Sequence, residues 1–415
     1  MTAPPVSAVT PAAVEAVPDA AGQGRAGPFA RLLAAAAVIG TALAVISGVD
    51  DWHTAHRVLA AIALPPLAGL LVLAAMSARR LLPAAVASIV FFGCAALFTG
   101  RDVHIVFAAL AFGASSLLAA QSFEGRAAFT GEPRDYLTLT KPRVMSLLLL
   151  TGGAAVFVGA SGVPAWGTFA ATMVGLALAC GGAATLNHYL DRDIDKLMGK
   201  RTAGRPVASG RVAPERALEY GLALSAASFV LLDSLVNLPT ALLALLGNAF
   251  YVLVYTRWLK RSTPQNIVIG GAAGAIPPLV GYAAASGHLG WAALTMFAIV
   301  FLWTPPHFWA LALMIREHYE NASVPMLPVV RGERETARQI ALYTVALVAA
   351  TLLPVAFGVF GLAYGAAALV LGAAFSWMTF QLWQETTRPR AVRLFHYSMI
   401  YLALLFVAMA LDAVV

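Results

Sequence analysis

The stretch that decides the fold is residues 187–195, NHYLDRDID, which directly follow an apolar segment over 166–186. A run of about 20 apolar residues can cross the hydrocarbon of a bilayer as a helix, so this polar motif stands at a membrane boundary. If the helix continues through the motif, residues four apart lie one turn apart on one face. Asn187, Asp191 and Asp195 then present three oxygen donors in a row.

The rest of the chain is equally apolar. Of the 415 residues, 60% are hydrophobic and 11% are charged, against roughly 25% charged in a typical soluble domain. This composition argues against a water-soluble fold and predicts an all-α polytopic membrane protein that is embedded in the lipid bilayer. The net charge of +7 does not indicate a nucleic-acid partner, because the basic residues fall between apolar segments rather than along one stripe.

Apolar length and charged breaks predict thirteen spans in two groups. Residues 1–30 lack a periodic apolar face and are expected to be disordered. Residues 31–122 form a four-helix transmembrane module, and residues 123–415 form a nine-helix domain. The first four spans are expected at 32–48, 57–77, 83–99 and 104–121. The other nine are expected at 144–160, 166–186, 217–235, 240–255, 267–285, 291–313, 340–357, 364–384 and 394–413.

The basic residues give these spans a consistent orientation. Alternating the spans from an inside N-terminus places all of the 27 Lys and Arg residues on one side except Arg57 and Arg101. Cytoplasmic loops of membrane proteins carry this excess. The N-terminus and the motif loops are therefore predicted to face the cytoplasm, in a multi-pass protein of the inner (cytoplasmic) membrane.

Cations follow the acidic motif closely. Mg²⁺ prefers hard oxygen donors and often bridges one or two carboxylates to substrate phosphates, so the row predicts a metal-bound diphosphate. Arginine also grips phosphate oxygens with two parallel hydrogen bonds. A solvated helix end is the alternative for any charged run, but acid and base together favour a metal-neutralised anion. The diphosphate contacts are predicted to be Arg205, Arg211, Lys260 and Arg261.

Four segments in register resemble the UbiA-type intramembrane prenyltransferases, and within them the branch that prenylates haem. The segments are NHYLDRDIDKLMGKRTAGRPVASGR (187–211), YTRWLKRSTPQNIVIGGAAGAIPPLVGY (255–282), FLWTPPHFWALAL (301–313) and VPMLPVV (324–330). The resemblance implies nine helices around a central cavity. It also implies that the farnesyl group of farnesyl diphosphate joins a vinyl group of haem B, giving haem O for haem-copper oxidases. Catalysis would rest on Asn187, Asp191, Asp195 and Lys260.

Two features beyond the acidic row bear on the acceptor and the metal. His307 lies in a span interrupted by Pro305 and Pro306, where an ionisable residue is either functional or satisfied by a freed carbonyl. The resemblance implies such a His in this segment and so favours placement of His307 on the haem or vinyl side. The family also has an Asp and a Gly where this chain has His318 and Ser323, which leaves the ligands of a second metal open, with Glu317 or Glu320 as candidates.

The four-helix module resembles one half of haem A synthase. His56 and His104 stand at the outer ends of two helices that run the same way, as a pair of axial haem ligands requires. Histidines that merely sit at the water boundary fit equally well. One half-bundle suits haem docking or partner binding, with haem A synthase as a candidate partner, better than a second activity.

Other functions remain open at this point. A related transferase could use a quinone precursor or a chlorophyllide as acceptor, although the segments 301–313 and 324–330 point to the haem branch. A membrane transporter would also have many spans and intramembrane polar residues. It would not explain acidic and basic loops arranged for a metal-bound diphosphate.

Overall fold

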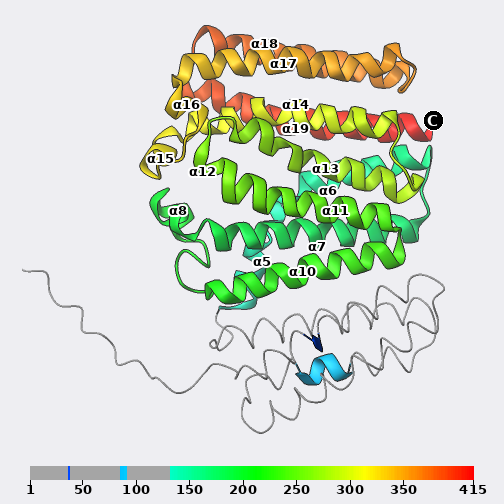
Figure 1. The fold of residues 1–415 in the computed structure, drawn as a ribbon. Helices are drawn as coiled ribbons and strands as arrows, with labels where there is room; N and C mark the ends of the chain where they lie inside the picture. Colours follow the sequence, from blue (N-terminus) through cyan, green and yellow to red (C-terminus); the bar gives the residue numbers. More distant parts are fainter. Residues whose placement is uncertain (1–35, 38–84, 91–130) are drawn as a thin grey trace, which may run out of the picture.

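The structure is a computed structural model and describes residues 36–37, 85–90 and 131–415 (Figure 1). Almost all of the predicted four-helix module, including His56 and His104, lies outside these residues. So does the N-terminal segment 1–30. The predictions for both parts therefore stay predictions.

Nine helices in the described part of the chain are long and apolar enough to cross a membrane. Strands are absent from these described residues. The predicted nine-helix membrane bundle is thus confirmed, with several helices extending further than their apolar cores. The spans are α6 (Pro142–Ala160), α7 (Trp166–Leu190), α10 (Pro214–Leu235), α11 to α12 (Leu238–Ser262), α13 (Asn266–Ser286), α14 (Trp291–Met314), α17 (Gly332–Ala356), α18 (Leu362–Gln384) and α19 (Arg388–Val414).

Short helices flank the spans at one end of the bundle. They carry the polar motifs found in the sequence. We call this end of the bundle the motif end. Its short helices are α5 (Pro133–Leu139), α8 (Arg192–Leu197), α9 (Lys200–Ala203), α12 (Lys260–Ser262), α15 (Arg316–Asn321) and α16 (Leu327–Val330). Four of them, α8, α12, α15 and α16, are seen at the left in Figure 1, opposite the C-terminus.

Small residues let α6 and α13 pack at very close range. A Cβ atom added to Gly281 would lie 1.9 Å from the Gly152 carbonyl oxygen, and one added to Gly159 would lie 2.5 Å from the Tyr282 carbonyl oxygen. Membrane helices associate by such close packing because lipid provides no hydrophobic drive between them. α13 also contacts α11 and α14, so it is the central helix of the bundle.

The prolines of α14 do not interrupt it, which corrects the expectation of a broken span. The helix runs from Trp291 to Met314 with Pro305 and Pro306 inside it. Neighbouring helices can support the backbone groups that proline leaves unpaired, and α14 is packed against α13, α17 and α19. Its middle is buried accordingly.

The fourth span changes its winding before it reaches the motif end. α11 (Leu238–Ala249) passes into a π-helix, η2 (Phe250–Leu259), which leads into α12. Pi-helical segments are rare and concentrate at functional sites because they re-aim side chains. Here the π-helix carries Tyr255, whose ring lies where a Cβ of Gly270 would be, 2.3 Å from Cδ2. The wider turn therefore fits against a glycine of α13.

Candidate active site

The acidic motif lies at a break between two helices. α7 ends at Leu190, Asp191 has φ −90° and ψ 4°, and α8 starts at Arg192. The condition of a continuous helix, on which the predicted row depended, is therefore not met. The consequence survives, because Asp191 N still donates to Asn187 O at 2.9 Å and Asp195 N to Asp191 O at 2.8 Å. These two bonds keep the three side chains on one side.

The three predicted ligand residues are buried. Asn187 is 3% exposed, and Asp191 and Asp195 are 0% exposed. Asn187 Nδ2 donates to Asp191 Oδ2 at 2.8 Å, so the first two members of the row touch. Burial raises the pKa of Asp195, while the nearby Arg205 acts in the opposite direction. Buried carboxylates need partners, and cations provide them here.

Two of the predicted cations contact the row directly. Lys260 Nζ lies 2.5 Å from Asp191 Oδ2, and Arg205 donates to Asp195 Oδ1 at 2.6 Å. Lys260 is itself 8% exposed. Lys260 and Arg205, both predicted as diphosphate contacts, therefore lie at the acidic row.

The second oxygen of each carboxylate fits a metal ion. Asp191 Oδ1 and Asp195 Oδ2 are buried and have no hydrogen-bond partner among the described residues. Buried acceptors without a partner are costly and uncommon in proteins. Two such oxygens, on carboxylates one helical turn apart, are the hard donors that Mg²⁺ prefers.

Arg261 is held beside the row by a third aspartate. Its guanidinium donates to both oxygens of Asp193, each at 2.7 Å, and to the Leu190 carbonyl at 2.8 Å. This two-pronged pairing lowers the pKa of Asp193. The same guanidinium is 3.9 Å from Asp191 Oδ1, so Arg261 stands close to one of the unpartnered oxygens.

Arg211 is the predicted diphosphate residue that makes its contacts elsewhere. It donates to Asp135 Oδ1 at 3.0 Å, to Ser209 Oγ at 2.9 Å and to the Gly204 carbonyl at 3.0 Å. These bonds tie the loop after α9 to α5. Arg211 therefore anchors the loop that carries Arg205 to α5.

Lys141 and Thr256 complete the polar network, although neither was among the predicted site residues. Lys141 Nζ donates to Asn187 Oδ1 at 2.6 Å, and Asn187 Nδ2 donates to Thr256 Oγ1 at 3.1 Å. Burial lowers the pKa of Lys141 to about 7, and the charge of Arg205 adds to this effect. Lys141 was counted only as a topology charge, and the position of Thr256 depends on the π-helix, which no sequence pattern predicted.

The loop after α14 approaches α8 from the opposite side. The His318 ring lies against Gly199, where an added Cβ would be 2.6 Å from Cδ2. Ser323 has φ 52°, the left-handed conformation that favours glycine, which gives a physical reason for the Gly that the resemblance implied at this position. Glu317 and Glu320 are exposed. The described residues contain no group of three or more His, Cys, Asp or Glu side chains that could hold a metal by itself, so the second-metal question stays open.

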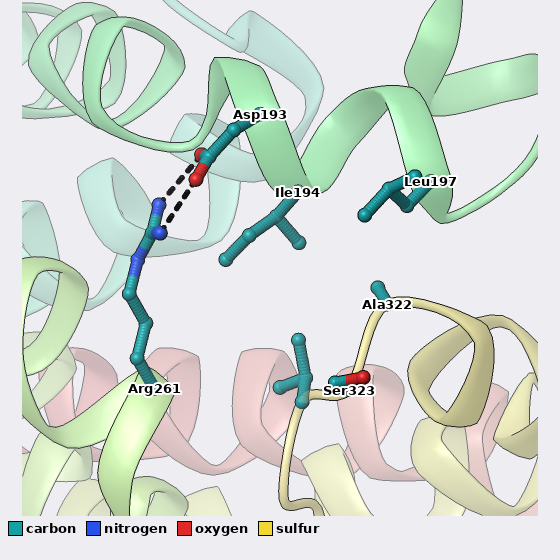
Figure 2. Close-up of a pocket in the computed structure, with 7 residues that line it drawn as sticks. Asp193, Ile194, Leu197, Arg261, Ala322 and Ser323 are labelled. Atoms are coloured by element: carbon teal, nitrogen blue, oxygen red, sulfur yellow. Dashed lines mark hydrogen bonds and ion pairs between the residues drawn. The ribbon is translucent and has the colours of Figure 1, made fainter.

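A pocket of about 210 Å³ separates this loop from α8 (Figure 2). The Asp193–Arg261 pair forms its polar side. Asp193 is two residues from both Asp191 and Asp195, so it lies on the other face of the chain. The pocket is therefore on the outer side of α8, next to the row. Its apolar lining comes from Ile194, Leu197, Ala322 and Val324.

His307 is packed between aromatic rings. Its ring stacks on Trp303 at 4.3 Å and on Phe395 at 4.7 Å between centroids. His307 Nδ1 is 2.7 Å from the Ser398 hydroxyl oxygen, so its partner is a hydroxyl group and not the freed carbonyl considered from the sequence. This packing fixes the imidazole but does not by itself assign a role to the other ring nitrogen.

A bundle of nine membrane helices with a buried acidic row and cations at one end is the arrangement of an intramembrane prenyltransferase. The profile of the UbiA prenyltransferase family matches residues 147–407. This chain belongs to that family.

Named relatives are similar over the same region. A protoheme IX farnesyltransferase from Symbiobacterium thermophilum is 54% identical over 281 residues, covering 67% of this chain and 94% of that protein. One from Gloeobacter violaceus is 50% identical over 68% of this chain and 92% of that protein. One from Roseiflexus castenholzii is 42% identical over 91% of this chain and 74% of that protein. The last alignment is long enough to include part of the segment before residue 123.

Solved structures share the fold at low sequence identity. A digeranylgeranylglyceryl phosphate synthase has a TM-score of 0.58 and 18% identity, covering 68% of this chain and 98% of its own. A UbiA homolog from Archaeoglobus fulgidus, bound to GPP and Mg²⁺, has a TM-score of 0.52 and 16% identity, covering 66% of this chain and 99% of its own. At these identities the similarity supports the fold alone.

Proposed function

We propose that this chain transfers the farnesyl group of farnesyl diphosphate to a vinyl group of haem B, giving haem O. The observation that carries the proposal is the buried row of Asn187, Asp191 and Asp195, which leaves two carboxylate oxygens free beside clustered cations. The named relatives, at 42–54% identity, support haem as the acceptor.

The proposed metal ligands are the oxygens of Asn187, Asp191 and Asp195. Bound Mg²⁺ would neutralise the diphosphate and make it a better leaving group. The donor set suits this ion because it offers oxygens only and leaves coordination positions for phosphate oxygens and water. The Archaeoglobus fulgidus homolog bound to GPP and Mg²⁺ is a precedent for the ligand pair on this fold.

The cations of the site would hold the diphosphate while its bond to the farnesyl C1 breaks. Lys260 and Arg205 each already contact a carboxylate of the row and can turn towards phosphate oxygens. Asp193 is the positioning residue for Arg261, because its two hydrogen bonds fix the guanidinium beside Asp191. Donors fixed in advance stabilise developing charge without a reorganisation cost.

The acceptor would approach from the membrane side of the row. The bond between the farnesyl C1 and the diphosphate oxygen breaks, and its electron pair leaves with the diphosphate. The π electrons of the haem vinyl group then form the new carbon–carbon bond to C1, which leaves a cation on the other vinyl carbon. Water then adds to the other vinyl carbon and releases a proton, which gives the hydroxyethylfarnesyl chain. His307 is the proposed contact on the haem side. An apolar cavity would keep water from the allylic cation before the vinyl group reacts.

The proposal assigns the motif end of the bundle to the cytoplasm, following the predicted excess of basic residues there. Farnesyl diphosphate would then enter from the cytoplasmic side and haem from the bilayer. For the segment 31–122, the proposed role is haem docking through His56 and His104, with haem A synthase as a candidate partner. A haem absorption spectrum that persists in the double variant His56→Ala/His104→Ala would contradict this docking role.

The test of the proposed function uses membranes that contain the full chain. They are incubated with haem B, farnesyl diphosphate and Mg²⁺. The pigments are then separated by chromatography and identified by mass spectrometry. We expect haem O in the complete mixture and none when EDTA removes the metal. A quinone precursor and a chlorophyllide are offered in parallel, and prenylation of either instead of haem would overturn the assignment.

A further inference from the structure

Lys141 occupies an unusual place at the junction of α5 and α6. Its backbone has φ 52° and ψ 55°, and Pro142 follows as the first residue of α6. A side chain in this left-handed conformation is strained, and such strain is kept where the surrounding structure requires it. In this conformation the Lys141 amine lies 2.6 Å from Asn187 Oδ1.

The charges of the site are paired except for this amine. Asp191 contacts Lys260, Asp195 contacts Arg205, and Asp193 contacts Arg261. Lys141 instead has the neutral amide of Asn187 as its hydrogen-bond partner in the described structure. Asp191 and Asp195 stabilise its charge from a distance without contacting it, so the burial of this cation is only partly compensated. The geometry therefore provides one positive charge more than the acidic side chains match.

The position of the amine points to the missing anion. Asn187 has a single side-chain oxygen, and Lys141 donates to it. A divalent cation held by that oxygen would repel the neighbouring ammonium group. A phosphate oxygen of a bound diphosphate would match the charge of the ammonium group instead.

We infer that Lys141 binds the diphosphate of the prenyl donor and holds the leaving group as the C1–O bond breaks. This inference rests on the proposed function. The electron pair of the C1–O bond goes to the diphosphate oxygen. The diphosphate anion favours the charged form of Lys141, which acts by charge and position and transfers no proton. It is the diphosphate contact that would come from the start of α6, whereas Lys260 comes from α12.

The test measures binding of inorganic pyrophosphate with Mg²⁺ to the purified full chain in detergent by isothermal titration calorimetry. Lys141→Gln can still donate to Asn187 but has no charge, and Lys141→Arg keeps the charge. We expect Lys141→Gln to weaken pyrophosphate binding by about tenfold or more, the usual effect of losing a charge-assisted hydrogen bond. Lys141→Arg should recover part of the loss.

Lys196→Gln is the matched control, because Lys196 is exposed on nearby α8, and its binding should equal that of the wild type. Thermal unfolding checks that each variant is folded. If Lys141→Gln is not folded, Lys141→Met takes its place. Wild-type affinity in a folded, uncharged Lys141 variant would overturn the inference. A wild-type chain that binds no pyrophosphate with Mg²⁺ would instead count against the proposed function.

Discussion

Asn187, Asp191 and Asp195 show how single residues prepare this site before any ligand binds. Each has a cationic partner, from Lys141, Lys260 and Arg205 respectively. The cations offset the cost of burying carboxylates in a membrane protein. The unpartnered oxygens of Asp191 and Asp195 remain available, so the site can take up a metal without first breaking every contact.

The left-handed backbone of Ser323, between α15 and α16, leads to a prediction about stability. Ser323 has φ 52°, and a residue with a Cβ loses roughly 1–2 kcal/mol in this conformation. Ser323→Gly should therefore raise the free energy of unfolding by up to about 1 kcal/mol, since glycine also gains freedom when unfolded. Thermal unfolding in detergent measures this change in stability. Ser323→Ala is the control, because alanine keeps the backbone strain. A lower midpoint for Ser323→Gly would contradict the explanation.

Two arginines that the sequence treated alike should behave differently. Arg205→Gln removes a contact to Asp195 and should raise KM for farnesyl diphosphate by about tenfold or more. Arg211→Gln removes an anchor to Asp135 and should leave KM within about twofold while lowering stability by up to about 1 kcal/mol. Steady-state kinetics and thermal unfolding separate the two effects. Equal changes in KM would restore Arg211 as a diphosphate contact.

At the scale of elements, the sequence predicted the helices better than their local geometry. Apolar length was enough for the nine spans, and the four-residue spacing correctly grouped Asn187, Asp191 and Asp195. The break at Asp191 and the π-helix over Phe250–Leu259 escaped prediction because both arise from tertiary packing. Thr256 reaches Asn187 only through that π-helix, so no pattern in the sequence could have assigned it.

The contact between α6 and α13 can be tested with two glycines of the same helix. Gly281→Ala would place a Cβ against the Gly152 carbonyl and should cost about 1–3 kcal/mol, because overpacked helices must separate. An added Cβ at Gly274 meets no atom within 4 Å, so Gly274→Ala should be tolerated. Thermal unfolding of both variants checks this, and equal stability would show that α6 and α13 are not closely packed.

For the whole molecule, the polar motifs from distant parts of the chain meet at one end because the spans alternate in direction (Figure 1). The distribution of Lys and Arg predicted this grouping. It could not predict which cations reach the carboxylates, since Arg205 and Arg211 differ only in the contacts that the loop after α9 makes. Composition and apolar length were therefore enough to predict the helices of the bundle. They did not predict which side chains contact one another in the site.

The orientation of the molecule gives a prediction at this scale. A cysteine at exposed Lys196, at the motif end, and one at Gly287, after the opposite end of α13, should react with impermeant thiol reagents from opposite sides. In inverted vesicles, whose cytoplasmic face is outside, Lys196→Cys should be labelled and Gly287→Cys should not. The reverse pattern would contradict a cytoplasmic motif end while leaving the fold unchanged.

The most direct test of the central claim, that the buried row holds the metal-bound prenyl diphosphate, is haem O formation by Asp191→Ala. Membranes with matched amounts of folded protein receive haem B, farnesyl diphosphate and Mg²⁺, and Glu215→Ala, a carboxylate away from the row at the start of α10, is the control. We predict a loss of haem O by about 100-fold or more in Asp191→Ala and wild-type yield in Glu215→Ala. Wild-type yield in Asp191→Ala would contradict the account.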